Sequence, residues 1–445
     1  MKIEKLSIKK GLDLPIDGAP ARQTTDLRWE ERYAVKPTDV VGFSPRLVVA
    51  EGDTVAAGQP LVVDKKDERI ALTSPVNGVV EAIVRGEKRK LLEVVVCRQT
   101  GQTRQTGQPL LTPEAPVWWM LRERPFGTIA NPDHKPKGIY VSMRDSNPLA
   151  PDIDYALAGR EHEFEAGVEA LEAYGKVHCV RAEGPHPAGN IGTIVAAQDP
   201  INKGECVWYV GAQDVANIGR WMLTGEYRPE RVVSVGGPAA KAPHYYRMTV
   251  GACLKHITEA QLMDANYPYL DNTTIPTRII SGSVLSGTAV AADGYLGMYD
   301  QQVSLIAEGD QYDFMGWLMP GLKKFSFSKT FLSGFLNGKV RVENGKMTCA
   351  GMNLPLTTFH FNTNVHGSVR PLMFTGDMER VFPFDIYPLQ LIKACIVGDV
   401  ELQEKLGIYE VEPEDFALCE FIDPSKTEIQ SVIREALEKL RKEAL

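Results

Sequence analysis

The sequence predicts a multidomain protein of mixed α/β and α+β class, and three observations lead to this prediction. A chain of 445 residues is too long for one compact core, so two to four domains are expected. Residues 36–100 hold short apolar runs separated by Gly and Pro, which is typical of a small β unit. After residue 101, strand-like runs alternate with helical spacing, and the C-terminal part is mainly helical. We therefore divide the chain into residues 1–100, 101–229, 230–305 and 306–445.

Residues 36–100 predict an all-β unit with strands in the segments 48–55, 58–63 and 70–80. This pattern resembles the biotinyl/lipoyl carrier fold, a flattened barrel-sandwich of two interlocked halves. Carriers of that kind hold a modified lysine in a hairpin, at the place that Lys65 and Lys66 occupy here. We expect both lysines to be solvated turn residues, because a shared fold does not imply a shared function.

Residues 101–229 predict an open, mainly parallel, Rossmann-like sheet. The segments 138–143, 177–180 and 206–210 are apolar runs of strand length. Between the first two, Phe164, Val168 and Leu171 repeat at helical spacing and predict a helix over residues 161–174. Because the strands are joined through helices, we expect them to lie parallel to one another.

Residues 230–305 predict a second β unit. The segments 232–238 and 246–254 indicate a hairpin that enters a short helix, and residues 278–284 return as a strand. This order of elements resembles the soluble-ligand-binding β-grasp module, abbreviated SLBB.

Residues 306–445 predict a mainly helical domain. Ser425 and Glu428 have the spacing of a capping box, in which Ser425 accepts from a free amide and Glu428 reaches back. An apolar stripe follows, made of Ile429, Val432, Ile433, Ala436, Leu437 and Leu440. Residues at this spacing lie on one face of a helix, and we expect that face to cover the protein's own core.

The sequence offers no recognisable binding loop for a nucleotide. Neither GxGxxG nor the phosphate-loop pattern GxxxxGKS/T occurs, and residues 282–287 only imitate a glycine-rich loop because no helical pattern follows them. A dinucleotide pyrophosphate is usually anchored by backbone amides at the start of a helix. We therefore expect neither a cofactor-binding residue nor NAD binding in this chain.

The seven cysteines are far apart, and even the closest pair, Cys395 and Cys419, forms no CxxC motif. Iron–sulfur and structural zinc sites usually take two ligands from one tight turn, so we expect no metal site. The thiols are interpreted as buried and reduced. No Ser/His/Asp order and no paired-carboxylate signature stands out, so we assign no catalytic residue.

Charge and hydropathy argue against nucleic acid and against a membrane span. The formal net charge is −8, with Lys and Arg spread along the chain, so nucleic acid is not an expected partner. The longest stretch without charged residues, 347–369, holds too many polar side chains to cross a bilayer. No apolar run follows the first residues, so no signal peptide is expected. We expect a soluble intracellular protein that works at a membrane only through a partner.

Short motifs in chain order carry a resemblance to one family. They are IKKGLDLPI at residues 8–16, LRERPF at 121–126, DSNPLA at 145–150, GPHPAG at 184–189, RIISGSV at 278–284, YLG at 295–297, QQVS at 301–304, GWLMPG at 316–321 and EDFALC at 414–419. Together they span almost the whole chain, which chance similarity does not explain. The chain resembles the A subunit of the bacterial sodium-translocating NADH:quinone reductase.

The resemblance implies a place in a larger redox complex that oxidises NADH, reduces quinone and exports sodium. It implies a peripheral subunit on the cytoplasmic face of the inner membrane, held by the integral-membrane B subunit. NADH, flavins, iron–sulfur centres and quinone belong to other subunits of that complex. Related subunits of complex I and of the Rnf complex carry a glycine-rich flavin loop and cysteine clusters. The matching region here, residues 121–130, has Pro125 and a single Gly127, so the resemblance implies no cofactor in this chain and no catalysis by the isolated chain.

Arg124, Phe126 and His186 are the candidates for residues near a quinone. A quinone headgroup needs apolar walls and hydrogen-bond donors near its carbonyl oxygens. These three residues lie in loops marked by Pro and Gly that offer such groups. The alternative is that the loops shape a domain interface, with His186 as a structural turn residue between two prolines.

Two other functions stay open from the sequence. The chain is a carrier protein if Lys65 or Lys66 is covalently modified. Intact-mass spectrometry of the native protein tests this, because an unmodified mass removes the alternative. It is a stand-alone flavin- or nicotinamide-dependent oxidoreductase if the purified protein shows flavin absorption or binds NADH.

Overall fold

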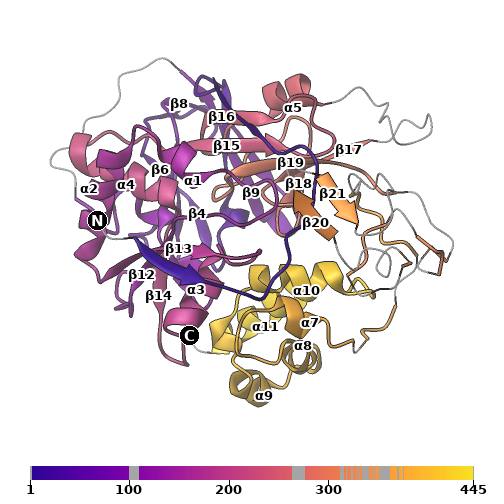
Figure 1. Cartoon of the computed structure of the whole chain (residues 1–445). Helices are drawn as coiled ribbons and strands as arrows, with labels where there is room; N and C mark the ends of the chain where they lie inside the picture. Colours follow the sequence, from indigo (N-terminus) through magenta and orange to yellow (C-terminus); the bar gives the residue numbers. More distant parts are fainter. Residues whose placement is uncertain are drawn as a thin grey trace.

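A computed structural model shows three β units and a C-terminal group of helices (Figure 1). It describes residues 3–99, 110–262, 276–310 and 375–443, together with 315–316, 318–321, 324–327, 329, 331–332, 340–343, 346–349, 361–367 and 370–373. Part of the GWLMPG motif and most of the uncharged stretch 347–369 lie outside these residues.

The N-terminal β unit consists of two small sheets, as the sequence predicted. One has the strand order β3-β9-β8-β5 and the other the order β4-β6-β7. The strands are β3 (Arg32–Val35), β4 (Pro45–Leu47), β5 (Thr54–Val55), β6 (Pro60–Asp64), β7 (Ala71–Thr73), β8 (Gly78–Arg85) and β9 (Leu91–Arg98), with 3₁₀ turns at Pro37–Asp39 and Glu87–Arg89. Leu61, Val94 and Val96 fill its core, whereas Lys65 and Lys66 are exposed in the loop between β6 and β7.

The α/β unit contains an open sheet with the strand order β1-β13-β12-β14-β10-β11. The strands β13 (Val177–Glu183), β12 (Ile139–Ser142) and β14 (Val207–Tyr209) are parallel, as predicted. Strand β1 (Glu4–Ser7), which the sequence did not predict, adds to β13 in parallel. The last two, β10 (Arg122–Arg124) and β11 (Thr128–Ile129), run antiparallel at one edge. This edge carries the candidate functional site.

Helices cover both faces of the α/β sheet because its strand residues are apolar on both sides. Ile139, Val141 and Trp208 share a core with α2 (Glu161–Glu172) and α4 (Ala212–Thr224). Tyr140, Val180 and Tyr209, which point the other way, share a core with α3 (Ile191–Gln198). The predicted helix over 161–174 is therefore found, with Phe164, Val168 and Leu171 all buried.

The second β unit has the strand order β18-β17-β19-β15-β16-β2. It contains the predicted hairpin, short helix and returning strand: β15 (Glu230–Gly236), β16 (His244–Thr249), α5 (Lys255–Gln261) and β17 (Thr277–Ser281), followed by β18 (Thr288–Val290) and β19 (Gln302–Ala307). One face packs on α5 through Ile257. The other face packs against α4 and α1 (Ile153–Leu157). The side-chain amide of Gln213 on α4 bonds to the backbone N–H and C=O of Val232 at 2.7 and 3.0 Å, and Ala156 on α1 packs against Val232.

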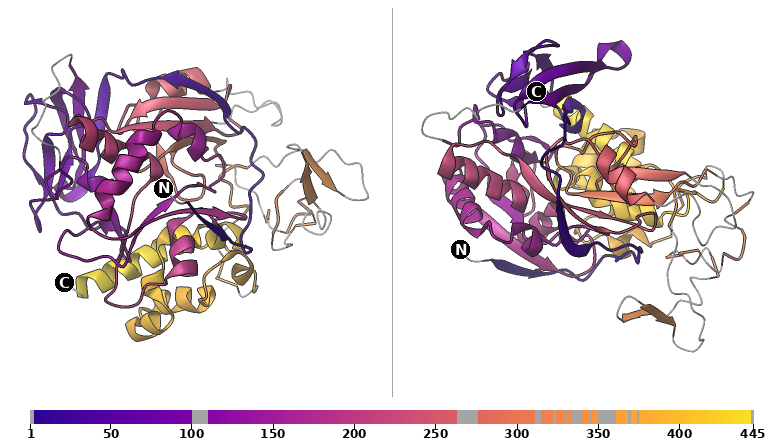
Figure 2. Two further views of the ribbon diagram at one scale, coloured as in Figure 1. Left: turned by 60° about the vertical axis from the view of Figure 1, so that its left-hand side comes forward. Right: turned by 90° about the horizontal axis from the view of Figure 1, so that it is seen from above.

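The N-terminal segment links all three β units, which the local sequence pattern did not indicate. Strand β1 pairs in parallel with β13, and β2 (Ala21–Asp26) pairs in parallel with β16 before the chain enters the barrel at β3. Figure 2 shows this indigo segment running along the α/β sheet and on to the second sheet.

The C-terminal helices form a core of their own against the α/β unit. They are α7 (Met378–Val381), α8 (Pro388–Val397), α9 (Val400–Lys405), α10 (Ala417–Ile422) and α11 (Ile429–Glu443), with 3₁₀ turns at Ile408–Glu410 and Pro413–Phe416. A two-stranded sheet of β20 (Val340–Glu343) and β21 (Lys346–Cys349) precedes them. The apolar stripe of α11 faces this core, as expected, with Val432 partly buried and its other members buried.

The capping box predicted at Ser425 is wrong. Helix α11 begins at Ile429, and the Ser425 hydroxyl donates to the carbonyl of Pro371 at 2.6 Å. The Asp423 carboxylate accepts from the amides of Ser425 and Thr427, in the turn before the helix, at 3.0 Å each. In the first turn of α11 the Gln430 amide donates to the Glu420 carboxylate at 2.8 Å. Lys426 has a φ of 56°, a left-handed conformation that cannot belong to the first helical turn.

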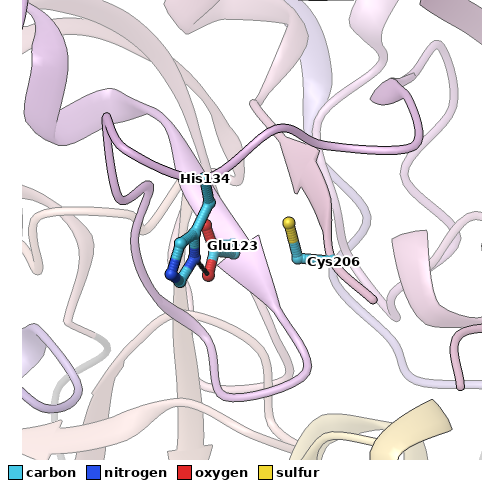
Figure 3. A group of neighbouring side chains, drawn as sticks. All are labelled: Glu123, His134 and Cys206. Carbon is cyan, nitrogen blue, oxygen red and sulfur yellow. Dashed lines mark hydrogen bonds and ion pairs between the residues drawn. The ribbon is translucent and has the colours of Figure 1, made fainter. Parts of the chain in front are cut away.

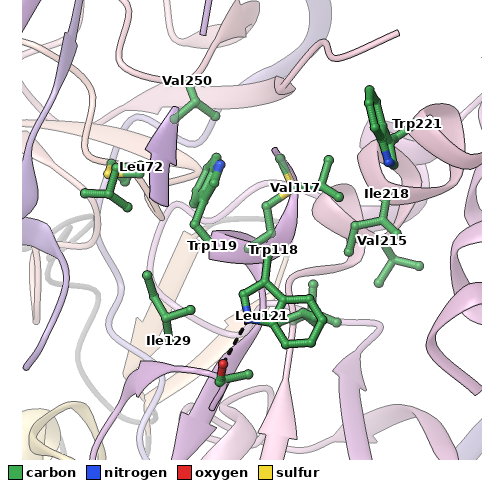
Figure 4. Close-up of a cluster of buried hydrophobic side chains, with 14 of the residues drawn as sticks. Leu72, Val117, Trp118, Trp119, Leu121, Ile129, Val215, Ile218, Trp221 and Val250 are labelled. Carbon is green, nitrogen blue, oxygen red and sulfur yellow. Dashed lines mark hydrogen bonds between the residues drawn. The ribbon is translucent and has the colours of Figure 1, made fainter. Parts of the chain in front are cut away.

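A pair of tryptophans joins the barrel to the α/β unit (Figure 4). Trp118 and Trp119, in the 3₁₀ turn Trp118–Met120, are 1% and 2% exposed. Their indole N–H groups donate to the Ala130 carbonyl at 3.0 Å and to the Tyr227 hydroxyl at 3.1 Å. Because both polar atoms are satisfied, the rings are buried without an unpaired donor. The strand that follows, β10, is thereby fixed in place.

Candidate functional site

A polar cavity of about 280 Å³ lies where the four parts of the chain meet. Its walls come from the barrel (Asp39), the α/β sheet (Arg122 and Tyr209), the second sheet (Tyr299 and Asp300) and the C-terminal segment (Glu412, Glu414 and Arg434). Convergence of side chains from all four parts on one cavity is the usual position of a binding site. We call it the central cavity.

Strand β10 places two arginines on the cavity side of the α/β sheet. Side chains alternate along a strand, so Arg122 and Arg124 share one face and Glu123 lies on the other. Arg122 lines the cavity, and its guanidinium carbon is 4.5 and 4.4 Å from the ring centres of Tyr209 and Tyr299. Contact with two aromatic faces stabilises the cation and fixes its direction.

The two tyrosines are held by hydrogen bonds and stay protonated. The Tyr209 hydroxyl donates to the Glu412 carboxylate at 3.2 Å, and the Tyr299 hydroxyl donates to the Trp119 carbonyl at 3.0 Å. Burial raises the pKa of both phenols, so they act as neutral donors near pH 7.

Arg124 is fully buried and forms an ion-pair cluster with the C-terminal segment. Its guanidinium donates to the Asp415 carboxylate and to the Glu410 carbonyl, the latter at 3.3 Å, and its Nε lies 3.6 Å from Glu412 Oε1. Burial lowers the pKa of Arg124, but Asp415 and Glu412 more than offset this and raise it. Removing one member would leave a buried charge without its partner, at a cost of about 3–5 kcal/mol.

The cluster also depends on a glycine at the start of α3. A Cβ atom on Gly192 would lie 2.2 Å from Asp415 Oδ1 and 2.6 Å from Arg124 Nη1. Such distances are far below van der Waals contact, so a larger residue would push the ion pair apart. The first turn of α3, strand β10 and the segment 410–415 therefore meet at one point.

Glu414 lines the central cavity, and its pKa is raised toward neutral. Burial raises its pKa to about 7, and the charges of Glu412 and Asp415 raise it further than Arg122 and Arg124 lower it. A carboxyl with this pKa exchanges its proton near physiological pH.

Of the three residues that the sequence singled out, Arg124 ends β10 and Phe126 follows two residues later, whereas His186 lies in the loop before α3. Phe126 is half-buried on the C-terminal core, with its ring 6.4 Å from that of Tyr409. His186 is 1% exposed, and burial lowers its pKa to about 4, so it is neutral. Its contacts hold the N-terminal segment: its backbone N–H donates to Asp13 at 2.9 Å and its carbonyl accepts from Leu12 at 2.7 Å.

Sequence reasoning missed most of the cavity. Arg122 and Glu414 lie inside the motifs LRERPF and EDFALC, but each has other charged residues beside it, so neither stood out from its neighbours. Tyr209 ends a buried strand and Tyr299 follows a Gly turn, so neither had a local pattern that set it apart.

The fold and the site define a multidomain protein in which a barrel-sandwich, an α/β sheet and a second β unit enclose one polar cavity. Comparison with known families agrees with this class. The NqrA N-terminal barrel-sandwich hybrid domain matches residues 6–99, the NqrA second alpha/beta domain matches 108–182 and 173–227, and the NQRA C-terminal domain matches 232–292.

Full-length relatives identify the family. The A subunit of the Na(+)-translocating NADH-quinone reductase of Rhodopirellula baltica is 36% identical, covering 98% of both chains. The proteins of the same name from Yersinia pestis and Histophilus somni are 36% and 37% identical, each covering 98% of this chain and 100% of theirs. The chain belongs to the family of A subunits of the Na(+)-translocating NADH-quinone reductase, which confirms the resemblance seen in the sequence.

Two further findings complete the comparison. The structure of an NAD+-reducing [NiFe]-hydrogenase matches 39% of this chain and 41% of its own at 11% identity with a TM-score of 0.28, a likeness too weak to support an argument. Among the helices of the described residues, none combines the length and the apolar character that crossing a membrane requires.

We predict that Glu414→Gln removes a pH dependence from the stability of the protein. The folded state keeps the Glu414 proton up to about pH 7, whereas an unfolded chain releases it near 4.5. The proton therefore stabilises the folded state fully below pH 4.5, and this contribution is lost as the pH rises through 7. Thermal unfolding across that range should show a smaller decline in Glu414→Gln than in the native protein, with the exposed Glu435→Gln as control. Equal declines in all three proteins would contradict the assignment.

Proposed function

We propose that this chain is a peripheral subunit of a Na⁺-translocating NADH-quinone reductase complex on the cytoplasmic face of the bacterial inner membrane. There it braces subunits that carry electrons from NADH to quinone and export Na⁺. The similarity to curated relatives, which runs over the full length of both chains, supports this assignment.

We also propose that the chain holds no redox cofactor of its own. The single observation that carries this is the electrostatic character of residues 121–130, where related flavin subunits have their phosphate-binding loop. Arg124 in this region is already paired with Asp415, and a Cβ atom on Gly127 would lie only 3.2 Å from Glu412. A flavin phosphate would therefore meet carboxylates at the place where it needs free backbone amides. The six cysteines whose side chains the structure describes are all free thiols, four of them buried.

The end of α8 and the start of α9 supply a surface for the membrane partner. Ile396, Val397 and Leu402 are 54%, 81% and 42% exposed there, although they are large apolar residues. Apolar side chains gathered at one exposed turn mark a contact with another protein. We propose that this turn docks on an integral-membrane subunit such as the B subunit.

We propose that quinone approaches two loops. One carries Arg124 and Phe126, and the other, before α3, carries His186. Of these three, only the Phe126 side chain is partly exposed, so it is the one that can touch a headgroup. Arg124 and His186 are buried and hydrogen-bonded, so their part is to hold the two loops in place. Gly127 lies next to Phe126 and lines the central cavity, which offers Arg122 as a hydrogen-bond donor.

The docking proposal predicts that Val397→Asp weakens assembly. A charge at the docking turn has to be desolvated when the partner binds, which costs several kcal/mol. Affinity purification of the tagged native chain from membranes in mild detergent should recover integral-membrane partners and an NADH-oxidising flavoprotein. Val397→Asp should recover much less of both, and Val84→Asp, at a 38% exposed valine on the barrel, should recover normal amounts. Recovery of a free monomer alone from the native chain would overturn the assignment.

The quinone proposal predicts that Phe126→Ala raises the quinone KM of the assembled complex by roughly tenfold, the loss of about 1.4 kcal/mol of contact. Phe421→Ala is the matched control, since Phe421 is also a partly buried ring on the C-terminal core. The NADH KM should stay unchanged in both variants. An unchanged quinone KM in Phe126→Ala, or the same increase in both variants, would remove Phe126 from the quinone site.

A further inference from the structure

The face of β10 opposite the central cavity carries a second group of chemically active side chains. Glu123 lies on β10, His134 in the loop after β11, and Cys206 directly before β14 (Figure 3). One ligand atom from each, a carboxylate oxygen, an imidazole nitrogen and the thiol sulfur, lie within 4.8 Å of one another. Nothing in the proposed function uses these residues, and the inference is independent of it.

The backbone brings these residues together through strand pairing. Strands β10 and β14 are antiparallel neighbours in which Glu123 is opposite Trp208, so Cys206 lies close to the end of β10. The loop 131–137 returns His134 to the same place, because the Lys137 amide donates to the Cys206 carbonyl at 2.8 Å. The group is therefore held by the edge of a sheet and not by one flexible loop.

Glu123 is oriented in advance by its buried surroundings. Its side chain is only 7% exposed, and its Oε2 accepts from the Trp208 indole at 2.9 Å and from the Asn131 amide at 3.3 Å. Its Oε1 points to His134 Nδ1 at 2.8 Å. The two N–H donors on Oε2 are the supporting hydrogen bonds that a metal-ligating carboxylate usually has. A bound metal would replace the contact between Oε1 and His134 Nδ1.

The set of donor atoms favours one class of cation. Thiolate, imidazole and carboxylate together suit Zn²⁺ and similar transition metals, whereas Mg²⁺ and Ca²⁺ prefer oxygen ligands alone. Bonds of about 2.0–2.3 Å to a tetrahedral Zn²⁺ place ligand atoms roughly 3.3 Å or more apart, so His134 must move outward by about half an ångström. Its side chain is 51% exposed, which gives it room to move and gives a cation an entry path.

We propose that Glu123, His134 and Cys206 form a binding site for a Zn²⁺-class transition metal, with water as the fourth ligand. Bound metal would tie the loop 131–137 and the start of β14 to β10, the strand that carries Arg122 and Arg124 on its other face. The sequence search missed the site because it looked for paired cysteines, whereas these ligands are distant in the sequence and meet only in the folded sheet.

Co²⁺ is the probe that tests the site, because a thiolate ligand gives Co²⁺ a near-ultraviolet charge-transfer band. The full-length protein, purified without a metal-affinity tag, reduced and stripped with a chelator, should develop this band at one equivalent of Co²⁺. Zn²⁺ should displace the Co²⁺ and abolish the band. Cys206→Ser should lack the band, and His134→Gln should bind at least about 100-fold more weakly.

Two matched variants distinguish metal binding at the proposed site from nonspecific binding to other thiols and histidines. Cys97→Ser removes another half-buried thiol. His256→Gln removes a histidine whose Nδ1 contacts Glu30 at 2.8 and 2.9 Å in the same way, but which belongs to no such three-ligand group among the described residues. Both should keep the Co²⁺ band and affinity. Thermal unfolding gives a second readout, since Zn²⁺ should raise the midpoint of the native protein and not that of Cys206→Ser. No band at stoichiometric Co²⁺, or a band that survives in Cys206→Ser, would overturn the proposal.

Discussion

The architecture depends on one buried cation. Arg124 is 0% exposed and is neutralised by carboxylates of the C-terminal segment, above all Asp415. A buried charge of this kind cannot lose its partner without a large cost, so the segment 410–415 has to remain on the α/β sheet. That segment in turn carries Glu412 and Glu414 into the central cavity and leads into α10 and α11. The ion pair thus determines both where the C-terminal helices sit and what the cavity contains.

Strand β10 serves two sites because a strand presents alternate residues to opposite sides. Arg122 and Arg124 face the cavity and the C-terminal segment, and Glu123 faces His134 and Cys206. Two tryptophans fix the chain just before β10, and their indole donors are both satisfied. A scaffold of this kind uses its buried charges to hold its parts together, which agrees with the proposal that electron carriers belong to other subunits.

Local pattern predicted the elements whose cause is local. The spacing of Phe164, Val168 and Leu171 gave α2, and the apolar run before Ser142 gave β12, because each reflects burial of a single face or segment. Contacts between residues distant in the sequence could not be predicted from local patterns. Nothing near Glu4 indicates that β1 pairs with β13, and nothing near Tyr299 indicates a contact with Arg122. Ser425 shows a third limit, since α11 starts only at Ile429 and Glu420, distant from the local pattern, accepts from the Gln430 amide in its first turn. Of the candidate site, the sequence indicated the charged motifs and left out the tyrosines that complete it.

Hydrogen exchange in α11 tests most directly whether the Arg124–Asp415 pair holds the C-terminal helices on the α/β sheet. The amides of α11 should be measured in the native chain, in Arg124→Met, in Asp415→Leu and in the double variant. If the pair holds the helices, each single variant loses protection by about 3 kcal/mol or more, and the double variant loses far less than the sum. Losses that simply add, or α11 protection equal to that of the native chain in both single variants, would contradict the account.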